Sequence, residues 1–445
     1  MTIEIMHIGF DDTDSPNRGC TTYIAAILVE ELTKIGAQFI DYPNLIRLNP
    51  NVPWKTRGNG ALCLRIRYED YLEERIRETV LEKIEENADL RYEGTDPGVV
   101  FFKGMHVPHD VVNFSKEAIT GIVTLRDALR LLKKFKIEAV GFKKARGIIG
   151  GLAAVGELLR GDYTFEIIAY RKPENYGKKR QVVVESVMEM NKITAPYTFN
   201  NIDFETGRVL ITPRGADPVL FAIRGETPEI VKKAFEIVNA LEPIERWVIF
   251  RTNHGTDTHL MRVEKLSQIK PYHSIIAEGI VVSYPKIVPR RHVIFSIDDG
   301  SARVDCAAYA PTGILNKVAG KLIPGDRVEV YGAVRPPSDN HPITINLEKI
   351  RILELAPKVI YQNPLCQNCG KRLKSMGKNK GFKCEKCGSR YLNAEKVKIE
   401  LKRDISCGLY VTSPRSQRHL TKPLERYGRE KFGEPVTLID KWHNP

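Results

Sequence analysis

Hydrophobic residues recur with the periods of strands and helices through the first 195 residues. The apolar run at 3–10 predicts a buried strand. Apolar positions three or four residues apart predict a helix over 21–35, and Gly36 follows as its stop. The same patterns predict further strands and helices, at 61–68, 70–86, 125–135, 145–156 and 163–170. This alternation indicates an α/β or α+β domain at residues 1–195.

A second mixed pattern occupies residues 196–268. It predicts two strands, a helix and a last strand, at 208–212, 219–224, 227–240 and 246–252. This order is typical of a split βαβ sandwich, so we expect a small ferredoxin-like α+β domain.

The clearest alternation lies in residues 269–357. Five strands are expected, at about 275–283, 291–298, 302–309, 326–334 and 343–353. Asp299-Gly300 predicts a tight hairpin turn between the second and third strands. A short helix is expected at 314–320, between the third and fourth. Five strands with a helix in that position predict an OB-fold β-barrel, which typically binds nucleic acid.

Four cysteines follow the predicted barrel with the spacing of a zinc ribbon. Cys366 and Cys369 form one CxxC pair, and Cys384 and Cys387 form a second pair fourteen residues later. The alternative is four unrelated thiols, which rarely fall at this spacing. We therefore predict a structural Zn²⁺ site in a ribbon at 358–395, where metal binding supplies folding free energy that so small a core lacks.

The excess of basic residues favours a polyanionic partner such as a nucleic acid. The 445 residues contain 68 Lys and Arg against 55 Asp and Glu, giving a formal charge of +13. Lysine-rich solvated surfaces are the alternative explanation. The sequence has no apolar run of about eighteen residues and no signal-peptide pattern, so we expect no membrane span and no secretion. The other four cysteines are scattered, as expected for a protein of the reducing cytoplasm.

The last segment, 396–445, is expected to be a basic tail. Its stretch 413–430 interleaves basic side chains with turn-forming residues, and we expect it to be disordered until RNA orders it. The candidate phosphate contacts are Arg415, Arg418, His419, Lys422 and Arg426. A solvated basic tail without such contacts is the alternative.

Carboxylates cluster directly after the first predicted strand. Asp11, Asp12 and Asp14 repel one another unless a cation neutralises them, and hard oxygen ligands at a strand end suit Mg²⁺ bound to nucleotide phosphates. An acidic turn is the alternative. Thr21 and Thr22 open the next helix, where one is a candidate N-cap or, alternatively, a phosphoryl acceptor.

Two glycine-rich basic strings are candidate phosphate sites. Lys55, Arg57, Gly58 and Gly60 precede a strand. Lys144, Arg146 and Gly147 open a helix whose free N–H groups attract anions. A plain turn and an ordinary glycine-packed helix are the respective alternatives.

The loop 253–259 is a further polar string, and it follows a predicted strand. Asp257 within it is a candidate counter-ion for a cationic ligand. A loop with a purely structural role is the alternative.

The order of these strings is itself specific. GFDDTDS, CTTY, IRLNPNVPWKTRGNGA, FKKARGIIGGLAA and RTNHGTDTH, followed by the barrel and ribbon segments, resemble the archaeal isoleucine-tRNA 2-agmatinylcytidine synthetases over essentially the whole chain. The resemblance implies a kinase-like domain at 1–195, then the ferredoxin-like domain, the OB-fold and the ribbon. It implies ATP-dependent attachment of agmatine to C2 of the wobble cytidine in the isoleucine tRNA with anticodon CAU, with release of AMP and phosphate, so that AUA is decoded.

The resemblance also implies roles for the candidate residues. Asp11, Asp12 and Asp14 become metal and catalytic carboxylates, and Thr21 becomes an autophosphorylated residue that can also serve as a cap. The two basic strings become ATP and phosphate sites, and Asp257 becomes a candidate residue in the wall of the agmatine pocket. The competing hypotheses are a non-enzymatic OB-fold and zinc-ribbon protein that binds single-stranded nucleic acid, and a different ATP-dependent RNA ligase or kinase.

Overall fold

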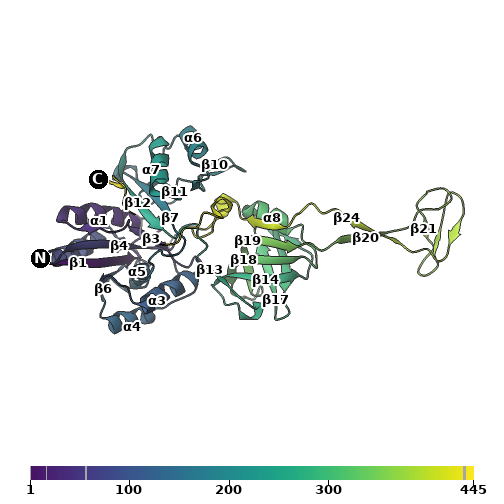
Figure 1. The fold of residues 1–445 in the computed structure, drawn as a ribbon, viewed down its shortest axis with the longest axis horizontal. Coiled ribbons are helices and arrows are strands. Elements are labelled where there is room, and N and C mark those ends of the chain that lie inside the picture. Colours follow the sequence, from purple (N-terminus) through teal and green to yellow (C-terminus); the bar gives the residue numbers. More distant parts are fainter. Residues whose placement is uncertain (1, 17, 56–57, 434–436) are drawn as a thin grey trace.

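The computed structural model describes residues 2–16, 18–55, 58–433 and 437–445 and is elongated (Figure 1). A large α/β unit lies at one end, a β-barrel lies in the middle, and a small cysteine-containing module lies at the far end. Both termini lie in the α/β unit, so the chain runs out to the far module and returns. Within the described residues, no helix has the length and apolar character needed to cross a membrane.

The α/β unit is organised around one eleven-stranded sheet with the path β6-β5-β1-β4-β3-β12-β7-β11-β8, while β2 pairs with β4 and β26 with β12. Its strands are β1 (Ile3–Asp11), β2 (Gln38–Phe39), β3 (Asn44–Arg47), β4 (Gly60–Glu69), β5 (Gly98–Lys103), β6 (Glu138–Gly141), β7 (Thr164–Arg171), β8 (Thr198–Phe199), β11 (Val219–Gly225), β12 (Ile244–Thr252) and β26 (His443–Asn444). A separate short ribbon pairs β9 (Ile202–Asp203) with β10 (Arg208–Val209).

Seven helices of the described residues belong to this unit; the apolar periodicity predicts five of them, and α3 and α6 were not predicted. They are α1 (Thr21–Ile35), α2 (Glu73–Asn87), α3 (His109–Thr120), α4 (Leu125–Phe135), α5 (Gly147–Gly156), α6 (Val184–Thr194) and α7 (Pro228–Ile237). The helix α1 ends where Gly36 takes a left-handed φ of 108°, which confirms the predicted stop. The helix α5 is buried along most of its length and packs against β1, β5 and α3.

The sheet is continuous across the expected division at residue 195. The parallel pairing of β3 with β12 joins the two halves. β7 precedes residue 195, yet its neighbours are β11 and β12, so its backbone hydrogen bonds place it with the second half. The division at 195 remains a prediction. No pattern in the sequence indicated the pairing between β3 and β12, which brings loops from both halves together.

The five barrel strands and their helix confirm the predicted elements. β14, β18, β19, β17 and β16 pair in turn, and β14 also pairs with β16, which closes the barrel. The bounds are β13 (Leu260–Arg262), β14 (Ser274–Val281), β15 (Lys286–Val288), β16 (His292–Asp298), β17 (Arg303–Ala308), α8 (Ile314–Ala319), β18 (Arg327–Arg335), β19 (Thr344–Glu354) and β25 (Gly408–Val411).

The module at the far end is joined to the barrel by two antiparallel strands, β20 (Lys358–Gln362) and β24 (Val397–Leu401). Beyond them lie β21 (Lys374–Ser375), β22 (Phe382–Lys383) and β23 (Arg390–Tyr391). The short 3₁₀ helices of the chain are η1 (Asp70–Leu72), η2 (Pro173–Asn175), η3 (Leu266–Gln268), η4 (Pro289–Arg291), η5 (Ala310–Thr312), η6 (Pro414–Ser416) and η7 (Leu424–Arg426).

The expectation of a disordered basic tail at 396–445 is wrong for the described residues. β24 pairs with β20, β25 extends the barrel sheet beside β19, and β26 joins the α/β sheet. Residues 412–431, here called the strap, run from the barrel back across the α/β unit. Five of their basic side chains pair with carboxylates far away in sequence, which composition alone could not reveal: Arg415, Arg418, Lys422, Arg426 and Lys431.

Candidate active site

A cavity of about 720 Å³ lies where the loops of the two sheet halves meet the strap. It is lined by the predicted acidic cluster, here called the acidic end, and by a set of basic side chains and histidines, here called the basic wall. The lining residues on which the argument depends are Asp11, Asp12, Asp14, Thr21, Arg47, Lys55, Gly58, Gly60, Arg146, Glu166, Asp217, Arg224, His254, Arg418 and His419.

The acidic end is built by close packing of the β1 end against α5. Gly150 allows this approach, because a Cβ there would lie 2.0 Å from the Asp11 carboxylate. Gly147 acts similarly, since its Cβ would lie 2.4 Å from the Asp11 carbonyl oxygen. Gly147 is therefore a packing residue, and it does not line the main cavity. Burial, and then the neighbouring Asp12, raise the pKa of Asp11 well above its usual range.

Asp12 is held in a defined position by Arg146. The Arg146 guanidinium donates to both Asp12 oxygens, from Nε at 2.9 Å and from Nη2 at 3.1 Å. Asp12 also has a φ of 61°, which is unusual for a residue other than glycine. Burial raises the pKa of Asp12, and Arg146 offsets part of that rise. Arg146 thus binds a carboxylate in this conformation, whereas Lys144 lies exposed beside a smaller cavity.

Thr21 lies in the cavity at the start of α1. Cys20, not a threonine, occupies the N-cap position, and no side chain caps the helix, so the N-cap expectation is wrong. The Thr13 hydroxyl donates to the Thr21 hydroxyl oxygen at 3.0 Å. The Thr21 hydroxyl is therefore oriented at the acidic end by a neighbouring residue of the DDTDS string.

The basic wall contains residues that the sequence did not single out. Glu166 on β7 accepts a hydrogen bond from Arg224 Nε at 3.0 Å, and Arg47 Nη2 lies 3.7 Å from its other oxygen. Burial alone would raise the pKa of Glu166, but Arg224, His254 and Arg47 hold it well below the usual range. A glutamate within an otherwise apolar strand was the available signal, because a buried charge needs partners.

Two histidines complete this wall as neutral groups. His254 and His419 are in edge contact, with ring centroids 4.9 Å apart. Burial and then Arg224 lower the pKa of His254 to about 3. Burial and then Arg47 lower that of His419 well below its usual range. Arg47, Arg224 and Arg418 therefore carry positive charge here at neutral pH without any contribution from the imidazoles.

The predicted string 55–60 lies beside this wall. Lys55 lines the cavity, and burial followed by Arg418 lowers its pKa. Gly58 leaves room for His419, whose Nε2 would lie 2.7 Å from an added Cβ. Gly60 likewise leaves room for Arg47. Arg57 lies outside the described residues.

Asp257 does not line the cavity, contrary to the expected agmatine wall. Its carboxylate accepts hydrogen bonds from Lys349 Nζ and from the Lys422 backbone N–H. The loop 253–259 instead fixes neighbouring elements: Asn253 Oδ1 accepts from the Arg47 N–H at 2.8 Å, and His259 Nε2 lies 3.0 Å from Glu348 on the barrel.

The candidate phosphate contacts of the tail separate into two groups. Arg415, Arg418 and His419 line the cavity. Arg426 is fully buried and Lys422 is nearly so, both paired with carboxylates, so the structure contradicts their expected contacts with RNA phosphate. Arg415 is mostly buried and pairs with Asp203 and Glu205.

The four predicted cysteine ligands converge in the module beyond the barrel. Their ligand atoms all lie within 4.8 Å of one another, and Sγ–Sγ distances are 3.5 Å for Cys366–Cys387 and 3.4 Å for Cys369–Cys384. Thiolates about 2.3 Å from a tetrahedral zinc lie about 3.8 Å apart, so this donor set fits Zn²⁺. Across the described ranges, no other His, Cys, Asp and Glu side chains form such a group, so the aspartates do not form a three-carboxylate cage here.

A cavity with an acidic end and a basic wall, in an α/β unit joined to a β-barrel and a four-cysteine module, is typical of enzymes that modify nucleic acids. Three family profiles match the chain: "TiaS TCKD domain" over 7–144, "TiaS FLD domain" over 145–259 and "TiaS C-terminal zinc ribbon domain" over 363–405. The chain therefore belongs to the TiaS family, the isoleucine-tRNA 2-agmatinylcytidine synthetases.

Individual relatives agree over nearly the full length. The TiaS of Staphylothermus marinus is 44% identical over 464 residues, covering 99% of this chain and 98% of the relative. That of Methanocaldococcus jannaschii is 42% identical over 426 residues, covering 95% and 98%. A solved complex of a TiaS with its isoleucine tRNA and ATP has a TM-score of 0.86 at 39% identity, and a solved complex with the tRNA, AMPCPP and agmatine has 0.84 at 37%. Each of these structural matches covers 95% of this chain and 97% of the other.

Proposed function

We propose that this protein attaches agmatine to C2 of the wobble cytidine in the isoleucine tRNA with anticodon CAU, using ATP, so that the tRNA decodes AUA. The observation that carries the proposal is a cavity lined by both a carboxylate cluster and a set of arginines, in a chain that matches its relatives over nearly its whole length. ATP, agmatine and a flipped base bring phosphates, cations and a nucleobase to one site, and this cavity offers partners for each.

The acidic end is suited to cations. We assign Asp11, Asp12 and Asp14 to Mg²⁺ and catalysis, since a bound cation would offset the burial and then the repulsion by Asp12 that raise the pKa of Asp11. One or two carboxylates with substrate phosphates are enough for Mg²⁺, which matches a set that forms no complete cage. When bound there, Mg²⁺ supplies charge neutralisation for phosphoryl transfer. Asp217 also lines the cavity and is a second carboxylate candidate for the cationic agmatine.

The basic wall is suited to nucleotide phosphates. Arg47, Arg224, Arg418 and Lys55 carry the positive charge, and Glu166 orients two of these arginines. Phosphoryl transfer depends mainly on positioning and on charge stabilisation of this kind. Of the predicted phosphate residues, Gly58 and Gly60 contribute by leaving space, and Arg146 contributes by positioning Asp12.

The reaction needs a leaving group at C2. ATP loses two phosphoryl groups to leave AMP: one passes to water and is released as phosphate, and the other passes to the C2 oxygen of cytosine, which becomes part of a phosphate ester. The primary amine of agmatine, after losing a proton, attacks C2, and the C2–O bond breaks with release of phosphate. In this proposal a side-chain carboxylate of the acidic end takes the proton, and the Thr21 hydroxyl, which belongs to a residue lining the cavity, accepts a phosphoryl group.

The barrel and the four-cysteine module would bind the tRNA body. We assign them as an OB-fold and a zinc ribbon, and the two halves of the α/β unit as kinase-like and ferredoxin-like domains. The elongated arrangement in Figure 1 separates the module from the α/β unit, whose residues line the cavity, as expected if the module contacts a part of the tRNA distant from the anticodon. A reducing, cytoplasmic setting fits this role, since all eight cysteines are unpaired.

The test uses purified protein with ATP, agmatine and a tRNA transcript bearing CAU. We expect AMP and an RNA mass gain, with turnover abolished by Asp12→Asn while tRNA affinity is retained. Asp404→Asn, which changes an exposed aspartate outside the cavity, is the matched control. Binding without turnover would leave only a nucleic-acid-binding protein, and turnover without agmatine incorporation would indicate a different RNA kinase or ligase.

A further inference from the structure

The strap is fixed at its barrel end by hydrogen bonds. Ser413 N–H donates to the Thr312 carbonyl oxygen at 3.0 Å, and the Thr421 hydroxyl donates to Glu348 on β19 at 2.8 Å. The segment between these contacts passes along the cavity. A stretch that lies beyond the four-cysteine module in sequence therefore forms part of the cavity wall.

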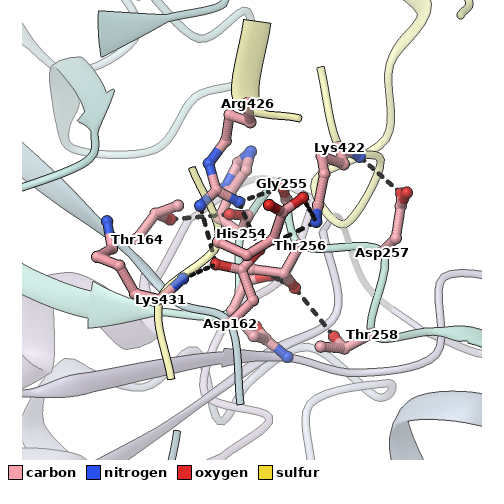
Figure 2. A network of polar contacts seen from close by, with 12 residues as sticks. Asp162, Thr164, His254, Gly255, Thr256, Asp257, Thr258, Lys422, Arg426 and Lys431 are labelled. Carbon is pink, nitrogen blue, oxygen red and sulfur yellow. Dashed lines mark hydrogen bonds and ion pairs between the residues drawn. The ribbon is translucent and has the colours of Figure 1, made fainter. Parts of the chain in front are cut away.

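At its other end the strap is anchored by a buried ion cluster (Figure 2). Arg426 donates from Nη1 and Nη2 to the two oxygens of Asp162, each at 3.0 Å, and from Nε to Glu226 at 2.7 Å. Lys422 lies 3.3 Å from Asp162, and Lys431 donates to Glu226 at 2.7 Å. Asp162 and Glu226 belong to the α/β unit, so these contacts hold the strap on it.

The anchor is connected to the cavity wall through one residue. Gly255 accepts a hydrogen bond from Arg426 Nη1 at 2.6 Å through its carbonyl oxygen, and its N–H donates to the His419 carbonyl oxygen at 2.7 Å. Gly255 has a φ of 69°, a conformation that suits glycine. It also follows His254, so the anchor fixes both histidines of the wall.

Between these anchors the strap presents Arg418 and His419 to the loop that precedes β4. Arg418 Nη1 donates to Asn51 Oδ1, and His419 fills the space left by Gly58. Two separate chain segments thus complete the basic wall together.

We propose that the strap is a positioning element for catalysis. In this assignment Arg426 is a positioning residue. It acts through the strap to hold Arg418 against residues 47–55, here called the 47–55 loop, where Arg418 binds a substrate phosphate group. The use of Arg418 in turnover rests on the proposed function, whereas the coupling between Arg426 and the loop does not.

A strap that only stabilises the fold predicts a different pattern. Loss of its ion pairs would then lower stability, and its effect on turnover would be independent of Arg418. A double-mutant cycle separates the two cases, since residues that act as one unit give non-additive effects.

The first experiment measures kcat/KM for ATP in tRNA- and agmatine-dependent AMP formation. We expect Arg418→Gln to lower it about tenfold or more through a lost charge-assisted contact, and Arg426→Lys to lower it about as much, with tRNA affinity retained. The double variant should be no worse than Arg418→Gln alone. The control Arg171→Lys alters another buried arginine pair, with Glu242, away from the cavity, and its effect should multiply with that of Arg418→Gln. Multiplicative effects of Arg426→Lys and Arg418→Gln would overturn the proposal.

The second experiment does not require activity. Amide hydrogen exchange of residues 47–55 in the full chain should accelerate in Arg426→Lys and stay unchanged in Arg171→Lys. If Arg426→Lys does not fold, Lys431→Gln weakens the same cluster at a less buried position and takes its place in both experiments. Unchanged exchange in the 47–55 loop would overturn the strap's positioning role even in an active enzyme, and accelerated exchange in an inactive protein would support it while the proposed function failed.

Discussion

The four-cysteine module and the strap are neighbours in sequence, and neither has a large apolar core of its own. The core of the module consists of Cys366, Leu373, Phe382 and Cys384, whereas the strap places Leu420 in the core of the α/β unit. Four thiolates that converge on one point stabilise the module. Ion pairs buried against a distant part of the chain stabilise the strap. Segments without large cores can thus be ordered either by local metal ligands or by ion pairs with distant residues. Metal removal should therefore disorder the module, and loss of the ion pairs should disorder the strap.

Zinc removal should have the largest effect and should be confined to the module. Structural zinc contributes about 10–16 kcal/mol of binding free energy in small domains, so a strong chelator should unfold residues 363–405. Hydrogen exchange would show loss of protection there and not in the strap or the α/β unit, and tRNA affinity should fall. Cys384→Ser should reproduce this result, while Cys407→Ser, at an exposed cysteine outside the ligand set, should not. Unchanged exchange after chelation would contradict the zinc site.

Breaking the strap anchor should rank second and should affect the α/β unit. Arg426→Met leaves Asp162 and Glu226 buried with less compensation, at a cost of about 3–5 kcal/mol. Urea unfolding should show that loss. Arg171→Met, which breaks the buried pair with Glu242, should cost a similar amount. Limited proteolysis within 412–431 should increase in Arg426→Met alone, and equal cleavage in both variants would show that the cluster does not hold the strap.

Acidification should weaken the contact between the strap and the barrel. Burial would raise the pKa of Glu348, but His259 and then Arg418 and Thr421 lower it to about 2. A carboxylate whose pKa is depressed in the folded state stabilises the fold at pH values above its unfolded-state pKa. That contribution to the free energy of unfolding, of about 3 kcal/mol, is lost as the pH falls from about 4.5 to about 2.

The matched variant for this acid effect is Glu348→Gln. It should flatten this part of the stability profile, measured by urea unfolding from about pH 5 to about pH 3. An identical pH dependence in both proteins would assign the acid effect to other carboxylates.

The smallest effect is expected for an exposed ion pair of the module. Lys374 Nζ lies 2.6 Å from Glu385, and both side chains reach solvent. Solvent screening leaves such a pair little net effect, so Lys374→Gln should not shift the unfolding midpoint of the zinc-loaded protein. A clear shift would mean that the module also depends on charge pairs, and the contrast with the strap would weaken.

The same contrast explains which parts of the site could be predicted. Asp11, Asp12, Asp14 and Thr21 were identified because they fall within one short string, and all of them line the cavity. Arg47, Glu166 and Arg224 of the basic wall were missed because they come from three separated strands, β3, β7 and β11. Asp257 was placed wrongly because its partner Lys349, ninety-two residues away, has no local signal.

The sequence by itself determined many strands and helices of the main units (β5, α3 and α6 were missed), the barrel topology, the zinc ligands and the acidic cluster. Each of these depends on residues close together along the chain, through side-chain periodicity, turn chemistry or ligand spacing. Only the tertiary structure decided that the two halves share one sheet, that the basic strap is buried and not disordered, and that Arg418 and His419 complete the cavity. The physical reason is that the free energy of a buried charge depends on its partners, and here those partners lie up to 264 residues away.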